Sequence, residues 1–341
     1  PVGKGGTYYP FAIQNPNTTG GATIQTEAFN AATGGAADGT TIGAGTLSTT
    51  EYWQASAVSG MFTSGLMQAG KTGLTASNII GSSTTLAGTY TSNGTNNFAA
   101  GTPPTLTRTV ADNLAAPTTF AIGTGITYYY YESGNPNVAG SWGTTSGAGL
   151  GTPAANFTTP GSVFVIENGY TATLTANLTF GTVANGVTLT VQSGGTLNTA
   201  TFAVIITGNN SAFNLQNGAT FQTQNIGGIN GTSLLTGAVQ INNTPTITYG
   251  SLVNFVLGSL AAGAQTNFQA FAPKPAITQV ANLTINGSAV NVWTLNSPLT
   301  VDATGTFTIN TGILKVNSTA PGGSLTLNGA GNTVVAGAGL H

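Results

Sequence analysis

The chain has 341 residues, of which only 4% are charged, against roughly 25% in an ordinary soluble domain. Five Lys and Arg, seven Asp and Glu, one His and no Cys leave few side chains for acid–base, nucleophilic or metal chemistry and none for disulfides. The cationic residues lie far apart along the chain, so no nucleic-acid partner is expected. No apolar run reaches the roughly 18 residues of a membrane span, and no cofactor is expected.

The rest of the composition favours strands. Hydrophobic residues make up 40% of the chain, enough for a buried core, and 50 glycines accompany abundant Thr, Asn and Ser. Straight-chain helix formers are scarce while β-branched residues are common, so the sequence predicts an all-β fold.

Residues 1–123 are expected to form one antiparallel β-sandwich module. Short apolar or alternating segments are separated there by long polar loops, a spacing typical of a compact sandwich. Strands are predicted at residues 11–13, 23–29, 51–54, 105–110 and 118–122.

Residues 124–160 are rich in Tyr and Gly and are expected to form a junction or the first turn of the next module. Tyr128, Tyr129, Tyr130 and Tyr131 are consecutive, and Trp142 follows. Their aromatic faces could bind glycans. Alternate residues of a strand face opposite sides, however, so two tyrosines should pack inward and two outward. We therefore favour a plug at the junction over a sugar site.

Residues 161–341 are expected to form a parallel β-helix or a similar solenoid. The segment 189–199 aligns with the segment 213–223, an offset of 24 residues, and solenoid repeats span roughly 20 to 50. Apolar residues alternate with Thr, Asn and Gln, which predicts an apolar interior and a neutral polar coat. Glycine at the centre of each segment fits a corner with positive φ. Looser copies follow at residues 299–307, 314–316 and 325–327.

The chain resembles modules of very large secreted proteins of Bacteroidota. The first part is similar to their β-sandwich module in Pro1-Val2-Gly3, in Tyr8-Tyr9-Pro10-Phe11 and in residues 47–53 and 120–123. The later part resembles their β-strand repeats at residues 162–174 and 282–286. The resemblance implies export by the type IX secretion route and an extracellular, cell-surface role as a fibre or adhesin.

The composition and the resemblance are compatible with three functions. The favoured one is a structural, non-enzymatic building block of a surface fibre, with the sandwich as joint and the solenoid as rod. The alternative is an adhesin module that binds glycans or surfaces through polar loops at residues 34–45 and 92–104. The minor alternative is a β-helix enzyme that degrades polysaccharide, which would need a carboxylate pair; Glu132, Glu167 and Asp302 are the candidates.

Four carboxylates of the first part could contribute to a calcium site, because Ca²⁺ takes carboxylate and carbonyl oxygens. No Asp-x-Asp-x-Asp spacing supports one. Solvated or backbone-capping carboxylates are the favoured interpretation for Glu27, Asp38, Glu51 and Asp112.

The ends of the chain suggest how copies join. An open solenoid end exposes unpaired N–H and C=O groups that can pair with another strand. Strand-like residues that include Val334 and Val335 lie near one end, and Pro1, Val2 and Gly3 open the other. We expect these ends to meet head-to-tail, either in tandem repeats of one polypeptide or in a non-covalent filament of copies.

Overall fold

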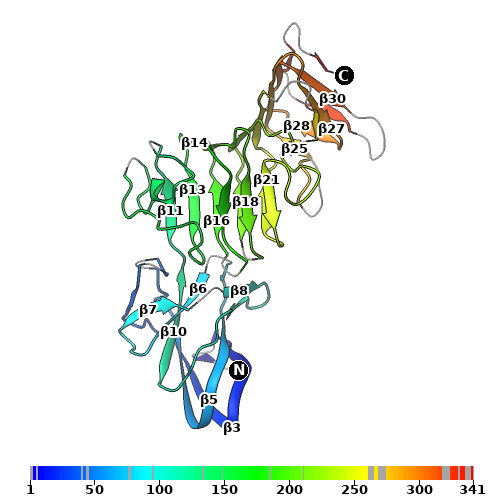
Figure 1. Cartoon of the computed structure of the whole chain (residues 1–341). Coiled ribbons are helices and arrows are strands. Elements are labelled where there is room, and N and C mark those ends of the chain that lie inside the picture. The colour runs from blue at the N-terminus through cyan, green and yellow to red at the C-terminus, as the bar shows by residue number, and fades with distance from the viewer. Residues whose placement is uncertain are drawn as a thin grey trace. The chain divides into compact units, whose positions relative to one another are not determined.

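The computed structural model describes residues 3–4, 7–39, 41–43, 46–75, 78–93, 96–132, 134–147, 149–183, 186–209, 211–259, 265–267, 274–316, 323–328, 331–334 and 339–340. Over these residues the predicted all-β class is confirmed: a 3-10 turn, Ala139–Ser141, is the one helical element, and the other regular elements are strands in antiparallel and parallel sheets (Figure 1). In this described part, no helix is long and apolar enough to cross a membrane.

The chain divides into two compact units. The first comprises Pro1–Thr127, Thr158–Val163 and Ala184–Val187. The second comprises Tyr128–Phe157, Phe164–Val183 and Thr188–His341.

The first unit contains an eight-stranded sheet in the order β4-β7-β6-β10-β5-β9-β8, with β3 on β5. Its pairings are antiparallel except that of β4 with β7. A separate two-stranded hairpin joins β1 (Gly3–Lys4) to β2 (Thr7–Tyr8). The sheet strands are β3 (Phe11–Phe29), β4 (Ala36–Ala37), β5 (Tyr52–Gly70), β6 (Asn78–Ser83), β7 (Thr89–Ser92), β8 (Asn96–Ala99), β9 (Thr105–Arg108) and β10 (Thr118–Thr124).

The longest pairing, β3 with β5, differs from the sequence prediction. Residues 14–22 were expected to be a loop between two strands, yet they continue β3 with several register shifts. Gly20, Gly21 and Gly60 all have positive φ, which glycine adopts without steric cost. A Cβ on Gly60 would lie 1.9 Å from the carbonyl oxygen of Gly21, so the two strands approach closely at this irregularity. These glycines allow β3 and β5 to bend without interrupting their pairing.

Both faces of this sheet carry apolar clusters. The larger cluster includes Trp53, Leu106 and Phe120, each fully buried. A second, smaller cluster includes Tyr52 and Tyr90. Adjacent positions on β5 therefore point into different clusters, as the two-residue period of a strand requires.

The second unit is built from stacked parallel strands. Successive strands enter different sheets, and within a stack most strands pair in parallel with the strand three places further on, for example β16 with β19 and β17 with β20. A first stack runs β12-β11-β13-β16-β19-β22, in which β11 and β12 pair antiparallel. Its strands are β11 (Thr127–Tyr130), β12 (Trp142–Gly143), β13 (Val163–Ile166), β16 (Thr188–Val191), β19 (Ala212–Leu215) and β22 (Thr246–Tyr249).

A second stack extends through every later repeat, and a third stack is shorter. The second holds β14 (Thr171–Thr173), β17 (Thr196–Asn198), β20 (Thr220–Thr223), β23 (Asn254–Leu257), β26 (Asn282–Asn286), β29 (Phe307–Thr311) and β32 (Thr333–Val334). The third holds β15 (Leu178–Phe180), β18 (Val204–Thr207) and β21 (Val239–Asn242).

Two further stacks accompany the later strands of the second stack. One holds β24 (Gln265–Asn267), β27 (Val292–Leu295), β30 (Ile313–Val316) and β33 (Gly339–Leu340). The other holds β25 (Gln279–Val280), β28 (Leu299–Val301) and β31 (Leu325–Leu327).

The predicted 24-residue alignment appears directly as strand register. Leu189 pairs with Phe213, and Leu197 pairs with Phe221; all four are buried. Most of their neighbours in the strands are partly exposed, which gives the alternation that the sequence predicts; Thr190, next to Leu189, is buried instead. The corner glycine Gly194, at φ 76°, has the positive φ expected of it.

Candidate functional site

The predicted aromatic residues form a buried cluster in the second unit. Tyr128, Tyr130 and Trp142 are 6%, 3% and 0% exposed, whereas Tyr129 and Tyr131 are partly exposed. Two tyrosines thus face inward and two outward, as the period of a strand requires. Burial raises the pKa of the Tyr128 and Tyr130 hydroxyls.

Trp142 lies at the centre of this cluster. Its ring meets Phe164 and Phe180 edge-on, with centroids 5.5 and 6.1 Å apart, and Tyr130 at 5.2 Å. The polar edges are also used internally: Trp142 Nε1 donates to the carbonyl oxygen of Pro136 at 3.0 Å, and the Tyr130 hydroxyl donates to that of Gly134 at 2.6 Å. These rings therefore build core and offer no open stacking face to a sugar.

Asparagines from the same segment cover the chain after β14. Asn137 Oδ1 accepts from Thr175 N at 2.8 Å, and Asn137 Nδ2 donates to the carbonyl oxygen of Ala176 at 2.8 Å. Asn135 Nδ2 donates to Thr175 Oγ1 at 3.1 Å. Together with the aromatic cluster, these contacts satisfy backbone groups that the first repeat would otherwise expose.

The last repeat is covered less well. Leu327 and Leu340 pair in register with Val301 and Leu314, which are both fully buried, yet the two leucines are 37% and 47% exposed. Among the expected joint residues, Val334 lies in β32 and pairs with Ile309, and Gly3 pairs with Tyr8. Pro1, Val2 and Val335 lie outside the described residues.

Two ion pairs lie among the described residues of the first unit. Arg108, fully buried, pairs with Asp112 and donates through Nη2 to the carbonyl oxygen of Ile80 at 2.9 Å. Burial lowers the pKa of Arg108 and raises that of Asp112, while their mutual attraction opposes both shifts. Lys71 Nζ lies 2.8 Å from both carboxylate oxygens of Glu51, which is 1% exposed.

Lys274 occupies a cage that sequence reasoning did not identify. Its side chain is buried, and its Nζ donates to the carbonyl oxygens of Asn230, Ser233 and Thr236 at 2.5, 3.0 and 2.9 Å. The same loop is held by Asn230, whose Oδ1 accepts from the Tyr249 hydroxyl at 2.7 Å. Burial lowers the pKa of Lys274 to about 8. This ammonium group therefore fastens the loop between β20 and β21.

Three of the candidate carboxylates accept hydrogen bonds from backbone N–H groups. Asp38 accepts from the backbone N–H groups of Thr41 and Ile42 at 2.9 and 2.8 Å, which is the backbone-capping role favoured from the sequence. Glu167 accepts from Gly147 N at 2.8 Å, and Asp302 accepts from Thr304 N at 3.0 Å. Across the residues with described positions, no group of three or more His, Asp or Glu side chains could hold a metal ion.

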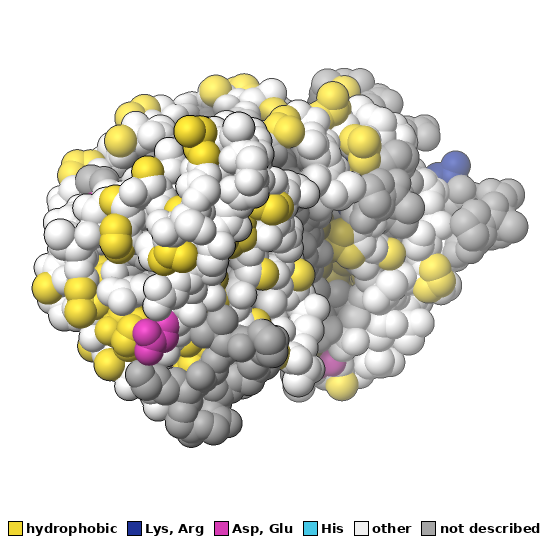
Figure 2. Space-filling view, turned by 90° about the horizontal axis from the view of Figure 1, so that it is seen from below, with side chains coloured by type: hydrophobic (Ala, Val, Ile, Leu, Met, Phe, Trp, Pro, Cys, Tyr) yellow, Lys and Arg dark blue, Asp and Glu magenta, His cyan; other side chains and the backbone are white. Residues whose placement is uncertain are grey.

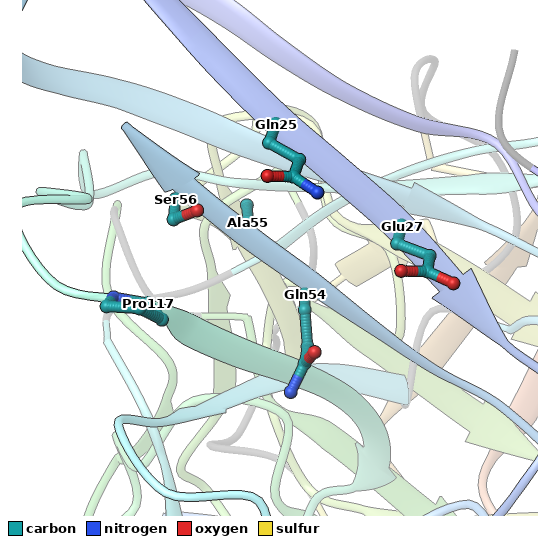
Figure 3. Close-up of a pocket in the computed structure, with 6 residues that line it drawn as sticks. All are labelled: Gln25, Glu27, Gln54, Ala55, Ser56 and Pro117. Carbon is teal, nitrogen blue, oxygen red and sulfur yellow. The ribbon is translucent and has the colours of Figure 1, made fainter. Parts of the chain in front are cut away.

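A polar pocket in the first unit is one candidate binding site among the described residues. It has a volume of about 210 Å³ and lies over β3, β5 and the start of β10 (Figure 3). Two carboxamides, one carboxylate and one hydroxyl line it, with small apolar groups between them. The lining residues are Gln25, Glu27, Gln54, Ala55, Ser56 and Pro117.

Strand register brings these polar groups together. Gln25 lies opposite Ser56 and Glu27 opposite Gln54 on the antiparallel pair β3 and β5. Gln54 also donates from Nε2 to Thr119 Oγ1 of β10 at 3.4 Å. From the sequence, Glu27 was a candidate calcium ligand or, as favoured, a solvated or backbone-capping carboxylate. The pocket was not predicted, because nothing in one sequence shows that residues 25–27 and 54–56 pair.

A second pocket of about 310 Å³ is lined almost entirely by hydroxyl groups of the same unit, on Ser82, Ser83, Thr84, Thr89, Thr91 and Thr118. Figure 2 shows one face of the molecule, where acidic and basic side chains are sparse among polar and apolar ones. The two pockets are thus lined mainly by hydroxyl and amide groups.

Fold and site together define an all-β chain with an antiparallel sheet, stacked parallel strands and a polar surface with few charges. The chain matches no family model, no curated protein and no solved structure.

Proposed function

We propose that the chain is a structural building block of an extracellular fibre, in which the parallel stacks close into a β-helix rod and the antiparallel sheet forms a sandwich joint. The observation that carries this proposal is the contrast between the two ends of the stacks. Trp142 and Asn137 cover the first repeat. In the last repeat, Leu327 and Leu340 are partly exposed, although the residues with which they pair in the preceding repeat are fully buried.

The exposed last repeat supports end-to-end joining. Parallel strands whose outer edge is unpaired can accept another strand, and inward-facing apolar residues gain from being covered. Because the exterior carries few charges, joining should depend little on salt. The proposal includes export by the type IX secretion route and display on the surface of a Bacteroidota cell, as the resemblance to such modules implies.

Electron microscopy of the purified chain at increasing concentration tests it. We expect elongated end-to-end assemblies, and Leu327→Asp with Leu340→Asp should abolish them. Val290→Asp is the matched control, because Val290 is 56% exposed at a turn outside the last repeat. Only isolated particles from the unmodified chain, or equal assembly of all variants, would contradict the fibre role. Denaturing mass spectrometry of native fibres separates tandem repeats from separate subunits.

The second candidate function is adhesion to glycans. The pocket lined by Gln25, Glu27 and Gln54 supports it, since hydrogen-bonding side chains held on paired strands suit recognition of a polar ligand. The two functions are compatible in one fibre. Catalysis has weaker support, because Glu167 and Asp302 each bind backbone N–H groups close to them.

A further inference from the structure

We propose that the second pocket of the first unit, which hydroxyl groups line, binds a single neutral sugar ring. This inference rests on the adhesive candidate function and assigns a ligand class to a site other than the pocket of Gln25 and Gln54. No charged residue lines the second pocket. Its lining residues are Ser82, Ser83, Thr84, Thr89, Thr91 and Thr118.

Strand register gathers these hydroxyl groups at the end of the apolar core. Ser82 of β6 lies opposite Thr91 of β7 and opposite Phe120 of β10. Phe120 is fully buried in the larger apolar cluster, and directly opposite residues share a face of the sheet. Thr118 precedes Phe120 by two positions and therefore faces the same side. On this face apolar side chains give way to hydroxyl groups, which explains why the pocket is polar.

A buried arginine supports the pocket from within the unit. Arg108 Nη2 donates to Ser82 Oγ at 3.1 Å. The same nitrogen donates to the carbonyl oxygens of Ile80 and Thr91 at 2.9 and 3.3 Å. The guanidinium group thus connects β6 to β7 and holds Ser82 opposite Thr91. Its charge is paired with Asp112, so the arginine supports the pocket without giving it a free cation.

The existing hydrogen bonds fix what three of the hydroxyl groups can offer a ligand. Ser82 accepts from the guanidinium group and Ser83 accepts from the backbone N–H of Thr85 at 3.3 Å, so both keep a hydrogen to donate. The Thr118 hydroxyl donates to the carbonyl oxygen of Ala116 at 3.1 Å, so its lone pairs can accept. The pocket therefore presents donors and acceptors side by side.

This mixture matches the hydroxyl groups of a sugar, each of which both donates and accepts. Opposite side chains of paired strands have Cβ atoms about 4.5–5.5 Å apart, so one ligand hydroxyl can bind Ser82 and Thr91 together. Thr84 and Thr89 supply further hydroxyl groups for a neighbouring position on the ring. An anionic sugar would lose hydration of its carboxylate without gaining a cation, which is unfavourable.

The size of the pocket limits the ligand to one ring. Its volume of about 310 Å³ lies at the lower end of the roughly 300–1,000 Å³ that ligand pockets span. A terminal sugar of a longer glycan could enter while the rest of the glycan stays outside.

Titration with galactose, glucose, mannose and glucuronate, followed by saturation-transfer NMR, tests the site. We expect at least one neutral sugar to bind with a dissociation constant in roughly the millimolar range and glucuronate to bind at least about tenfold more weakly. Thr89→Val combined with Thr91→Val replaces two hydroxyl groups by methyl groups of the same shape in a strand, where valine is favoured. This double variant should bind the neutral sugar about tenfold or more weakly, because two hydrogen bonds are lost.

Thr63→Val is the matched control, because Thr63 is exposed on β5 and does not line the pocket. Circular dichroism of each variant establishes that the fold is intact. Equal losses in the control, or glucuronate binding as tight as that of the neutral sugars, would overturn the assignment.

A glycan array run with the same proteins and with Gln54→Ala separates this site from the adhesive function. Glycan binding that persists in the double variant and disappears in Gln54→Ala would overturn this site and leave adhesion through the other pocket standing. An array and a titration that are both blank for the unmodified chain would overturn the site and glycan adhesion together.

Discussion

Removing the buried ammonium group of Lys274 should change how stability depends on pH. Its Nζ donates to three backbone carbonyls of the loop between β20 and β21, and the residue is 3% exposed. Lys274→Met keeps most of the aliphatic stem and deletes the titrating group. Lys315→Met is the matched control, because Lys315 is exposed on β30 of the same unit.

The magnitude follows from the pKa. Burial lowers the pKa of Lys274 from 10.5 to about 8, which corresponds to about 3 kcal/mol of free energy. Between these two pH values the unfolded chain holds a proton that the folded chain has released. Stability of the unmodified chain relative to Lys274→Met should therefore rise by about 3 kcal/mol as pH increases from 7 to 10.5.

The comparison with the variant removes the contribution of tyrosines. Burial raises the pKa of Tyr90, Tyr128 and Tyr130, so the unfolded chain ionises first and stability falls above pH 10 in both proteins. Urea unfolding followed by tryptophan fluorescence at several pH values gives the difference directly. A difference that is flat, or that falls, between pH 8 and 10.5 would refute the reasoning. It would mean that the three carbonyls stabilise the ammonium form more than burial disfavours it.

Three further substitutions, with one control, test side-chain contacts in the two units. Arg108→Met should lower the free energy of unfolding by about 3–5 kcal/mol in urea, because Asp112 stays buried without its cation; a loss below about 1 kcal/mol would contradict this. Trp142→Ala should cost about 3–5 kcal/mol and abolish near-ultraviolet dichroism from the aromatic cluster, and an unchanged spectrum would argue against that cluster. Asn282→Ala should cost about 1–2 kcal/mol, since Thr306 N loses its acceptor. Thr284→Ala, outward on the same strand, should cost less than about 0.5 kcal/mol; equal losses would contradict the asparagine role.

The repeats were predictable because they are local and periodic. The alignment of Leu189 with Phe213 is a strand pairing, and the alternation of apolar and polar residues predicts which side chains are buried, except for Thr190. Gly194 was predictable at a corner because other residues rarely tolerate its positive φ. These features depend only on a segment and its repeat, so they can be recognised in a single sequence.

The pocket and the lysine cage depend on contacts between distant segments. Glu27 meets Gln54 only through the register of β3 and β5, and that register shifts at several bulges. Lys274 binds carbonyl oxygens of residues about 40 positions away. Every residue has a backbone carbonyl, so the sequence does not show which ones bind the lysine. The continuity of β3 was missed because Gly20 and Gly21, which usually indicate a turn, here bend a strand that continues.

The scarcity of charge in this sequence has a structural reason in the parallel stacks. In-register stacking places equivalent side chains about 4.8 Å apart in columns, so a column of lysines or glutamates would repel itself. Neutral amides and hydroxyls instead bind along the column: Asn282 Nδ2 donates to Asn254 Oδ1 at 2.6 Å, and Thr306 Oγ1 donates to Asn282 Oδ1 at 2.9 Å. Each repeat thereby binds the next through side chains as well as backbone. A chain that grows by adding such repeats gains stability from Asn and Thr at the positions where charged residues would destabilise it.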